Sequence, residues 1–442
     1  MSGKNSCVIY APVDTLSGYG SLARDTTKSI IELKKDEWDI KIISCGWGNT
    51  PNGFIDDNPE WKFLNDYMIQ GQLTTQPDVF IWMTIPTEFQ KVGKYNIGIT
   101  AGLETDLVPG DWIEGCNRMD LVLVSSEHGK KGFEISKYQK QNPQTKMFEG
   151  NIELKTPVEV LFVGMNTNIY KFLETPNKEI GALNTIPEEF CYLFVGHWLQ
   201  GDVGEDRKNV GLLIKAFFET FKNKKNRPAL VLKTSIVGPS YMDRDEILKR
   251  IKVIRDTVNS TDLPNVYLLH GEFTDEEMNQ IYNHPKVKAM VSLTKGEGFG
   301  RPLLEFSLSK KPIIASNWSG HIDFLQPAYN VLVGGSITPV HKSAQAKNMI
   351  LAEASWFTPS DAEVADAYKS VYNDYSKHLE NAKRQAHFAK TNFSFDKMAE
   401  ILDNIFETKV PKQVELKLPA LKKLGSVTET PKISLPKLKK LD

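Results

Sequence analysis

Two glutamates eight residues apart, Glu297 and Glu305, are the residues of this sequence best placed to do chemistry. They flank a glycine-containing loop in the stretch TKGEGFGRPLLEF. The apolar run before the loop predicts a buried strand, and Pro302 fits the first position of a helix after it. Gly298 and Gly300 would let a ligand approach the backbone, and the start of the helix would offer free N–H groups to an anion. Glu305 is expected in the first helical turn.

The chemistry of this stretch points to a ligand with two kinds of group. Glycine N–H donors suit phosphate, whereas carboxylates repel phosphate and accept hydrogen bonds from hydroxyl groups. A nucleotide sugar has both, with a diphosphate between a ribose and a hexose. The stretch alone also fits an ordinary strand-to-helix turn with two solvated glutamates.

Short apolar runs alternate with helix-like segments along most of the chain. This alternation predicts an α/β protein with two parallel sheets, each covered by helices on both faces. Two doubly wound, Rossmann-like domains would then face each other across a cleft, with ligands at the carboxyl ends of the strands. The expected strands are 7–13, 39–45, 78–83, 95–100, 120–126 and 158–164 in the first series, and 190–196, 229–235, 265–271, 287–293 and 311–316 in the second.

The C-terminal part of the chain differs from the rest. We expect domains at 1–180 and 181–390, a closing helix at 391–408 and a flexible tail at 409–442. The tail carries nine lysines, three acidic residues and two near-copies of an LPxLKKL motif. It is either a solvated tail whose leucines rest on the protein surface or a duplicated motif for a partner or an anionic polymer.

Bulk composition excludes several classes of protein. The net charge of −1 predicts no global attraction to nucleic acid or membrane. No apolar run reaches the ~18 residues of a membrane span, and the N-terminus leads directly into a strand, so we expect no signal peptide. The four cysteines lack metal-like spacing and predict reduced core thiols in a cytoplasmic protein. They are Cys7, Cys45, Cys116 and Cys191.

Several segments, in the same order along the chain, resemble GT-B glycosyltransferases of the retaining family four, or glycosyltransferase group 1. EGFGRPLLE resembles the family's E-x7-E signature, and FVGHWLQGDVGEDRKNVGLLIKAF resembles its diphosphate-binding segment. GEFTDEEMNQIYNH is similar to the segment beside the nucleotide base. KPIIASNWSGHIDFL resembles the strand and turn that follow, and VEVLFVGMNTNIY the strand leading into the interdomain linker. In the first half, DTLSGYGSLARDTTKSI resembles the glycine-rich loop that closes over the donor phosphates.

The resemblance implies transfer of a glycosyl group from a nucleotide diphosphate sugar, with retention of configuration and no required cofactor. It places the acceptor in the first domain and the nucleotide sugar in the second. The Asp-x-Asp sequence of this chain, Asp243-Arg244-Asp245, lies outside the segments that carry the resemblance, and we expect no essential metal. The implied catalytic residues are Glu297, Arg207, Lys208 and Glu104. The implied donor-binding residues are Gly18, Tyr19, Gly20, His197, Lys233, Gly298, Phe299, Gly300, Arg301, Leu303 and Glu305.

The chain also departs from the family pattern. GLETDLVPGDWIEGCNRMDLVLVSSEHGKKGF resembles a segment in which many members carry a histidine near the sugar, but here Glu104 is the polar residue closest to that point. Many relatives have arginine where this chain has His197. Trp112, Trp318 and His321 are candidates for the acceptor groove, with packing as the alternative for both tryptophans.

Three other functions remain open from the sequence. The chain loosely resembles glycosyltransferases of large tailed bacteriophages, and some enzymes of that kind glycosylate hydroxymethylated DNA bases. The basic tail would then supply affinity for DNA phosphates, in the cytoplasm of a host. A nucleotide-sugar epimerase or hydrolase on the same fold is a second alternative, and a binding protein that has lost catalysis is a third.

Overall fold

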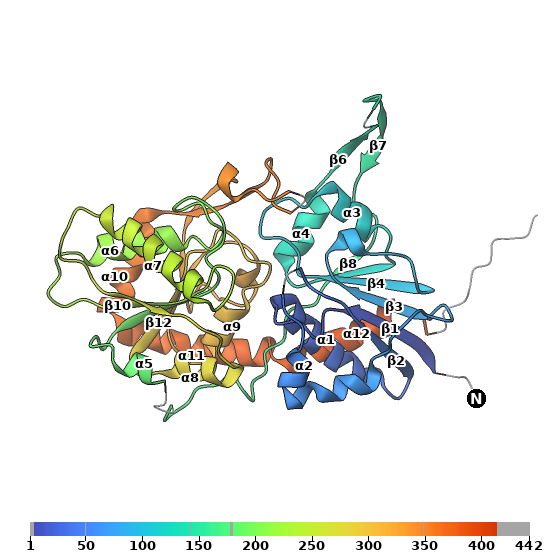
Figure 1. The fold of residues 1–442 in the computed structure, drawn as a ribbon, viewed down its shortest axis with the longest axis horizontal. Coiled ribbons are helices and arrows are strands. Elements are labelled where there is room, and N and C mark those ends of the chain that lie inside the picture. Colours follow the sequence, from blue (N-terminus) through green and yellow to red (C-terminus); the bar gives the residue numbers. More distant parts are fainter. Residues whose placement is uncertain (1–3, 49, 143, 177–179, 348, 413–442) are drawn as a thin grey trace, which may run out of the picture.

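The computed structural model describes residues 4–412 except residues 49, 143, 177–179 and 348. It has two lobes, each built on a parallel six-stranded sheet (Figure 1). The first sheet has the order β2-β1-β3-β4-β5-β8, and the second has the order β11-β10-β9-β12-β13-β14. The first comprises β1 (Asn5–Ala11), β2 (Trp38–Ser44), β3 (Val79–Met83), β4 (Tyr95–Thr100), β5 (Leu121–Val124) and β8 (Val158–Val160). The second comprises β9 (Cys191–Val195), β10 (Ala229–Lys233), β11 (Val266–Leu269), β12 (Val287–Ser292), β13 (Ile313–Ser316) and β14 (Val331–Val333).

Helices cover both sheets, which confirms the predicted fold class of two Rossmann-like domains in the GT-B arrangement. The first lobe has α1 (Gly18–Lys34), α2 (Phe54–Asp57), α3 (Gly110–Cys116) and α4 (Glu127–Ile135), with 3-10 turns at Pro59–Tyr67 and Pro86–Glu88. The second has α5 (Gly181–Asn184), α6 (Val210–Phe221), α7 (Tyr241–Asp256), α8 (Asp275–Asn283), α9 (Arg301–Ser307), α10 (Asp361–Asn373) and α11 (Tyr375–Asn392), with 3-10 turns at Gly320–Asp323 and Lys342–Ala344. The last helix is α12 (Phe395–Lys409).

Every predicted strand is present, because fully buried parallel strands are apolar along their whole length. Two antiparallel hairpins were not predicted: β6–β7 (Tyr138–Gln141 and Phe148–Ile152) and β15–β16 (Gly335–Pro339 and Ser355–Pro359). The β6–β7 hairpin projects from the first lobe and is mostly exposed (Figure 1). Its strands therefore lack the apolar pattern on which the prediction depended.

In each sheet, the direction in which the chain adds successive strands reverses between two central strands. The chain passes from β9 to β10 and β11 on one side, and then returns to β12 on the other side of β9. The first sheet makes the same reversal between β1 and β3. Ligands of open α/β sheets bind where the strand order reverses, beyond the carboxyl ends of the strands. The loops after β1, β9 and β12 therefore mark the expected binding positions.

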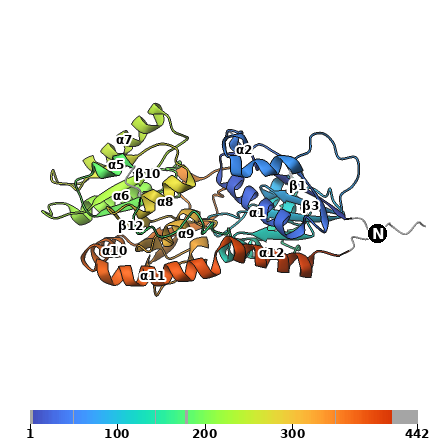
Figure 2. The same cartoon turned by 90° about the horizontal axis from the view of Figure 1, so that it is seen from below.

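The chain passes between the lobes twice, and the two connecting segments lie against each other. The first follows β8, and the second lies between α11 and α12, so that α12 packs on α1 of the first lobe (Figure 2). Met165 and Phe395 pair through the backbone, since Met165 accepts from the Phe395 N–H at 2.8 Å and donates to the Phe393 carbonyl at 2.9 Å. Lys34 of α1 contacts Asp403 and Glu407 of α12. The closing helix thus begins four residues later than predicted, and it packs on the first lobe.

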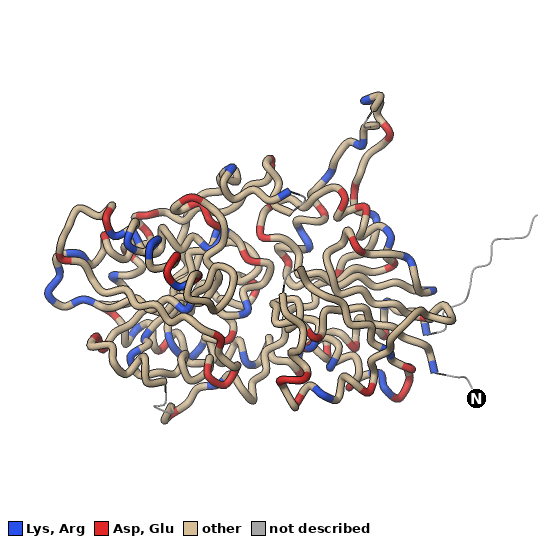
Figure 3. The backbone as a smooth tube through the Cα atoms, in the orientation of Figure 1, with Lys and Arg blue, Asp and Glu red and all other residues tan. Residues whose placement is uncertain are grey.

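Acidic and basic residues are interspersed over both lobes (Figure 3). In the part of the chain that the structure describes, none of the helices combines the length and the apolar character needed to span a bilayer. Residues 413–442, with both copies of the LPxLKKL motif, lie outside the described residues. The predicted domain limits and the role of the tail stay predictions.

Candidate active site

The loops after β9 and β12 lie side by side, because these two strands are neighbours in the second sheet. The backbone ties the loops together: the Lys295 N–H donates to the Arg207 carbonyl at 2.8 Å, and the Thr294 hydroxyl donates to the same carbonyl at 3.2 Å. The β9 loop carries Arg207 and Lys208 just before α6, and the β12 loop carries Glu297 just before α9. The sheet therefore brings together side chains that are 89 residues apart in the sequence.

These loops form a cluster of four charged side chains with one member from the other lobe. Lys208 Nζ contacts Glu297 Oε1, and Arg207 Nη1 lies 3.6 Å from Glu297 Oε2. The same Nη1 lies 2.8 Å from Oε1 of Glu104, which follows β4 of the first lobe. The side chains of Lys208 and Glu297 are 11% and 9% exposed. All four implied catalytic residues thus meet, and their formal charges cancel.

The electrostatics of the cluster keep Glu297 ionised. Burial by itself raises the pKa of the Glu297 carboxyl, but Lys208 and Arg207 outweigh it and lower the pKa below its usual value. Burial lowers the pKa of Lys208 below its usual value, although Glu297 and Glu104 act against this shift. The cluster is therefore a set of mutually dependent ion pairs whose cations an incoming anion could attract away from the carboxylates.

Two glycines of the β12 loop allow the backbones of the two lobes to approach each other closely. A Cβ atom on Gly296 would lie 1.8 Å from the Glu104 carbonyl oxygen, and one on Gly298 would lie 2.6 Å from the Ala101 carbonyl oxygen. The Gly298 carbonyl accepts from the hydroxyls of Ser125 at 3.2 Å and Ser126 at 2.6 Å. The sequence suggested that Gly298 makes room for a ligand, but in this arrangement its backbone meets the first lobe. Gly300 has a positive φ of 95°, a conformation that favours glycine.

Glu305 lies in a second charged cluster on α9. Its Oε1 accepts from Arg301 Nε at 2.8 Å, and its Oε2 accepts from the Tyr282 hydroxyl at 3.0 Å. Arg301 also lies 3.1 Å from Asp25 of α1 and 4.0 Å from Asp275 of α8. Arg301 is the first residue of the helix, so Glu305 lies one turn into it and not in the first turn as predicted. This cluster also crosses between the lobes, through Asp25.

Burial raises the pKa of Glu305 to about 7, and the negative charge of Asp275 raises it further. Arg301 and the Tyr282 hydroxyl lower it, but do not outweigh burial. The unperturbed value is 4.5. Between these two values the folded protein binds more protons than the unfolded chain, so this group's contribution to stability is lost as the pH rises. We expect wild type to lose stability relative to Glu305→Gln between pH 4.5 and about 7. Urea unfolding across this range tests the expectation, and parallel pH profiles for the two proteins would contradict it.

The glycine-rich loop after β1 becomes the start of α1. Gly18 is its first residue, and the Ser17 side chain caps it by accepting from the Gly20 N–H. The Tyr19 hydroxyl lies 2.9 Å from the Thr100 hydroxyl and accepts from the Ala101 N–H at 3.1 Å, so it fixes the loop to the end of β4. A Cβ atom on Gly20 would lie 2.2 Å from the Thr15 carbonyl oxygen, whereas Gly18 has nothing within 4 Å of that position.

The two glycines of this loop provide a matched pair of substitutions. Gly20→Ala should destabilise the protein by about 1–3 kcal/mol, because the methyl group overlaps the Thr15 carbonyl. Gly18→Ala should leave stability within about 0.5 kcal/mol, but should weaken nucleotide binding if phosphates approach this N–H. Thermal unfolding and calorimetric titration separate the two effects. Unchanged nucleotide affinity in Gly18→Ala would show that Gly18 does not contact the nucleotide.

Comparison with known proteins agrees with this geometry. Residues 192–351 match the family model described as glycosyl transferases group 1. The matched residues begin at β9 and include all the later strands of the second sheet. No curated protein matches the sequence significantly.

Solved structures extend the likeness to both lobes. Anabaena HepE in complex with UDP and glucose superposes with a TM-score of 0.58 at 13% identity, over 91% of this chain and 100% of that chain. Sucrose-phosphate synthase from Thermosynechococcus elongatus gives 0.59 at 12% identity, over 92% and 98%. A glycosyltransferase from Rickettsia africae gives 0.60 at 13% identity, over 93% and 100%. At these identities the likeness establishes the fold.

Two predicted donor residues of the second lobe lie at the carboxyl ends of neighbouring strands. His197 follows β9, and its Nδ1 lies 3.0 Å from the Ser235 hydroxyl. Lys233 ends the neighbouring strand β10, with its Nζ 5.6 Å from the centre of the Phe273 ring. Among the described residues, no carboxylate forms an ion pair with Lys233. Lys233 thus lies at the carboxyl edge of the sheet, where burial lowers its pKa and the charge of Glu272 acts against this shift.

Other predicted side chains are buried. Phe299 and Leu303 are buried in the hydrophobic core, so only their backbone could meet a donor. Trp112 packs on Phe133 inside the first lobe, which makes it a core residue and not part of an acceptor groove. His321 is fully buried, and its Nε2 lies 2.6 Å from the Ser316 carbonyl oxygen.

Sequence reasoning missed His128, in the first turn of α4. Its ring packs edge-on against Trp318 of the other lobe, with 4.5 Å between ring centres. Burial lowers its pKa to about 4, so the imidazole is neutral. Its Nε2 is buried and has no hydrogen-bond partner among the described residues. The signal was present, because His128 lies within the segment in which a family histidine was expected, but in a helix after the next strand.

Proposed function

We propose that this protein is a glycosyltransferase that transfers a sugar from a nucleotide diphosphate sugar. The observation that carries the proposal is the cluster of Lys208, Arg207 and Glu297 at the point where the strand order of the second sheet reverses. Two cations next to a carboxylate match a ligand that presents a diphosphate next to a hydroxyl-bearing sugar. Residues 192–351, which match the glycosyltransferase family model, contain all three.

Lys208 and Arg207 would bind the diphosphate in place of their present carboxylate partners. As the glycosidic bond breaks, negative charge develops on the diphosphate, and fixed cations stabilise it in the transition state. Glu297, released from Lys208, would accept hydrogen bonds from hexose hydroxyls and stabilise positive charge on the sugar ring. Lys233 and the N–H groups of the Gly18 loop would complete the phosphate site.

Glu305 would accept hydrogen bonds from the ribose hydroxyls. The Tyr282 hydroxyl and Arg301 fix the orientation of its carboxylate, as their contacts at 3.0 and 2.8 Å indicate. Because the pKa of Glu305 is about 7 in the empty site, binding a ribose would favour its ionised form. Nucleotide affinity is therefore expected to rise with pH through neutrality.

We also propose retention of configuration without a divalent metal. An inverting enzyme needs a free base on the acceptor side. Asp106 accepts from the Ser355 N–H at 2.6 Å and is therefore not free to act as such a base. Glu104 would be released from Arg207 when the donor binds, so replacing Glu104 with glutamine, with product stereochemistry as the readout, distinguishes retention from inversion. The cations already in the cluster can balance the diphosphate. Product stereochemistry and activity in the presence of EDTA test these two points.

A thermal-shift panel of nucleoside diphosphates and nucleotide sugars tests the proposed donor site. One ligand should raise the melting temperature of wild type by mass action, and Glu305→Ala should reduce that shift. Glu276→Ala provides the matched control, since Glu276 is an exposed residue of α8. No shift with any nucleotide, or an equal loss in both variants, would refute a nucleotide-sugar site around Glu305.

A further inference from the structure

We propose that a second site, separate from the donor site, binds a compact phosphorylated organic molecule such as a sugar phosphate or a nucleotide. The site is a pocket of about 460 Å³ between the interlobe crossing and α11. Its volume is in the range of pockets that hold small ligands. The proposal depends only on the pocket and not on the glycosyl transfer proposed above.

Three segments of the chain form the walls of this pocket. The interlobe crossing contributes Thr167 to Phe172, the end of α9 contributes Leu308 and Lys310, and α11 contributes the face that carries Lys383, Ala386 and Lys390. The first segment connects the lobes, and the other two belong to the second lobe. A ligand bound here would contact the connection between the lobes and the body of the second lobe together.

The charged lining of the pocket is entirely basic. Four lysines line it, and no carboxylate does. Lys383 pairs with Glu380, which lies outside this pocket. Within the described part of the chain, the other three lysines form no ion pair, so their charges are available to an anion. These three are Lys171, Lys310 and Lys390.

The pocket also offers apolar and aromatic surface to the organic part of a ligand. Leu308 and Ala386 lie in its lining together with the rings of Tyr170 and Phe172. Lys310 Nζ lies 4.4 Å from the centre of the Phe172 ring, a cation–π contact that holds the cation over the aromatic wall. Cations next to apolar surface suit a sugar or base that carries phosphate, more than inorganic phosphate alone.

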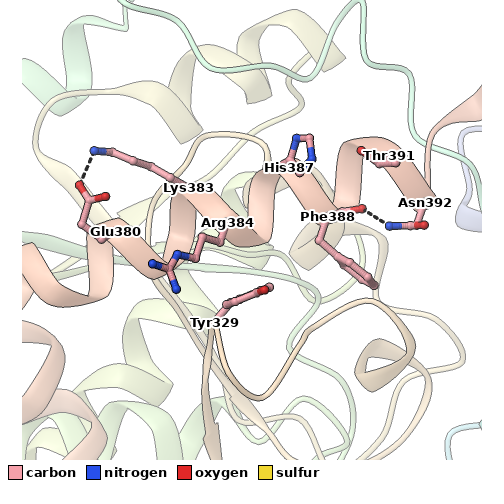
Figure 4. Close-up of a pocket in the computed structure, with 8 residues that line it drawn as sticks. All are labelled: Tyr329, Glu380, Lys383, Arg384, His387, Phe388, Thr391 and Asn392. Atoms are coloured by element: carbon pink, nitrogen blue, oxygen red, sulfur yellow. Dashed lines mark hydrogen bonds and ion pairs between the residues drawn. The ribbon is translucent and has the colours of Figure 1, made fainter.

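An adjoining pocket of about 570 Å³ extends the basic surface around α11 (Figure 4). Both pockets share Lys383 and His387, and the second adds Arg384 and Tyr329. Figure 4 shows Lys383 and His387 on one side of α11 and Arg384 on the other, beside Tyr329. A ligand with more than one phosphate could therefore contact cations on both sides of the helix. Two hollows of this size favour a compact ligand over a long polyanion, which needs an extended surface.

The pocket is distinct from the donor site but adjacent to it. Tyr170 lines the pocket, and its hydroxyl donates to Asp275 Oδ1 at 2.9 Å. Asp275 lies 4.0 Å from Arg301, which holds Glu305. Tyr170 thus separates the two sites.

Calorimetric titration at about 0.15 M salt tests the proposal, with fructose 1,6-bisphosphate, ATP, inorganic phosphate and a short DNA duplex as probes. We expect saturable one-to-one binding of fructose 1,6-bisphosphate or ATP. Tighter binding of the first indicates a sugar phosphate as the ligand of the pocket, and tighter binding of ATP indicates a nucleotide. Lys383→Glu/Lys390→Glu should weaken that binding at least about tenfold. Lys208→Met, which acts at the proposed donor site, should leave fructose 1,6-bisphosphate binding unchanged.

The control is a matched charge reversal on another exposed helix face, Lys249→Glu/Lys252→Glu of α7. All four lysines are exposed, so we expect both double variants to fold, and circular dichroism verifies this. Equal weakening by the two double variants would overturn the site. Absence of saturable binding by either organic phosphate would also overturn it, as would binding restricted to DNA.

Discussion

Replacing Lys208 with methionine is expected to weaken nucleoside diphosphate binding by about 10- to 100-fold. The Lys208 side chain is 11% exposed and contacts Glu297, so it is held in place before the ligand arrives. A hydrogen bond to a charged group contributes about 1.5–3 kcal/mol, which corresponds to roughly this range of Kd. Methionine keeps the length and apolar stem of lysine and removes only the charge. Calorimetric titration with the nucleotide selected by the thermal-shift panel measures the change without requiring an acceptor.

Lys215→Met is the control for this experiment. Lys215 lies on α6, the helix that follows Lys208, and its side chain is exposed. The same change of residue type there should leave the nucleotide Kd within about twofold of wild type, since exposed charges contribute little. If Lys208→Met bound the nucleotide as tightly as wild type, Lys208 would be a structural partner of Glu297 and the proposed diphosphate site would be wrong.

Replacing Arg301 with methionine is expected to cost about 3 kcal/mol of stability at pH 7.5, the largest effect on folding that the structure predicts. The guanidinium stands between Glu305, Asp25 and Asp275 and joins α9 to α1. Without it, the buried carboxylate of Glu305 loses its ion pair, and Asp25 keeps only the weaker effects of Arg24 and Lys28. Burial raises the pKa of both, so acid neutralises them and the loss should shrink as the pH falls toward 5.

Urea unfolding of wild type and Arg301→Met at pH 7.5 and pH 5 measures both parts of this prediction. Arg244→Met provides the control, because Arg244 is exposed and its contacts among the described residues are with Asp245 and the ring of Tyr241 on its own helix. The loss of unfolding free energy in Arg244→Met should stay below about 1 kcal/mol at both pH values. A loss in Arg301→Met that is equally large at both pH values would show that packing of the arginine stem, and not its charge, stabilises the contact between the lobes.

The closed arrangement of the lobes explains why the site residues pair as they do. Glu104 and Asp25 of the first lobe contact Arg207 and Arg301 of the second. The Gly298 carbonyl accepts from two serine hydroxyls of the first lobe. Donor binding would exchange the Glu104 and Glu297 contacts for phosphate contacts at the same cations, so we expect ligand and lobe closure to depend on each other.

The sequence by itself determined the strands, the order of elements and the loops that carry the site. Buried parallel strands are continuously apolar, and glycine or proline marks the turns between them, so each of these signals is local. The sequence therefore placed Arg207 and Lys208 in the loop after β9, and Glu297 and Glu305 around the turn after β12, where the structure has them. The exposed β6–β7 hairpin had no such signal, since its strands bury little apolar surface.

Only the tertiary structure decided which side chains meet. Arg301 and Asp25 are 276 residues apart, and Ser126 and Gly298 are 172 residues apart. No local pattern specifies such contacts, because they depend on how two separately formed sheets face each other. The packing of the lobes also brings Gly298, which was expected to contact a ligand, against Ala101 of the first lobe, and it places His128 against Trp318. Residue types and spacing indicate what a loop can bind, whereas the packing of the lobes decides what it contacts.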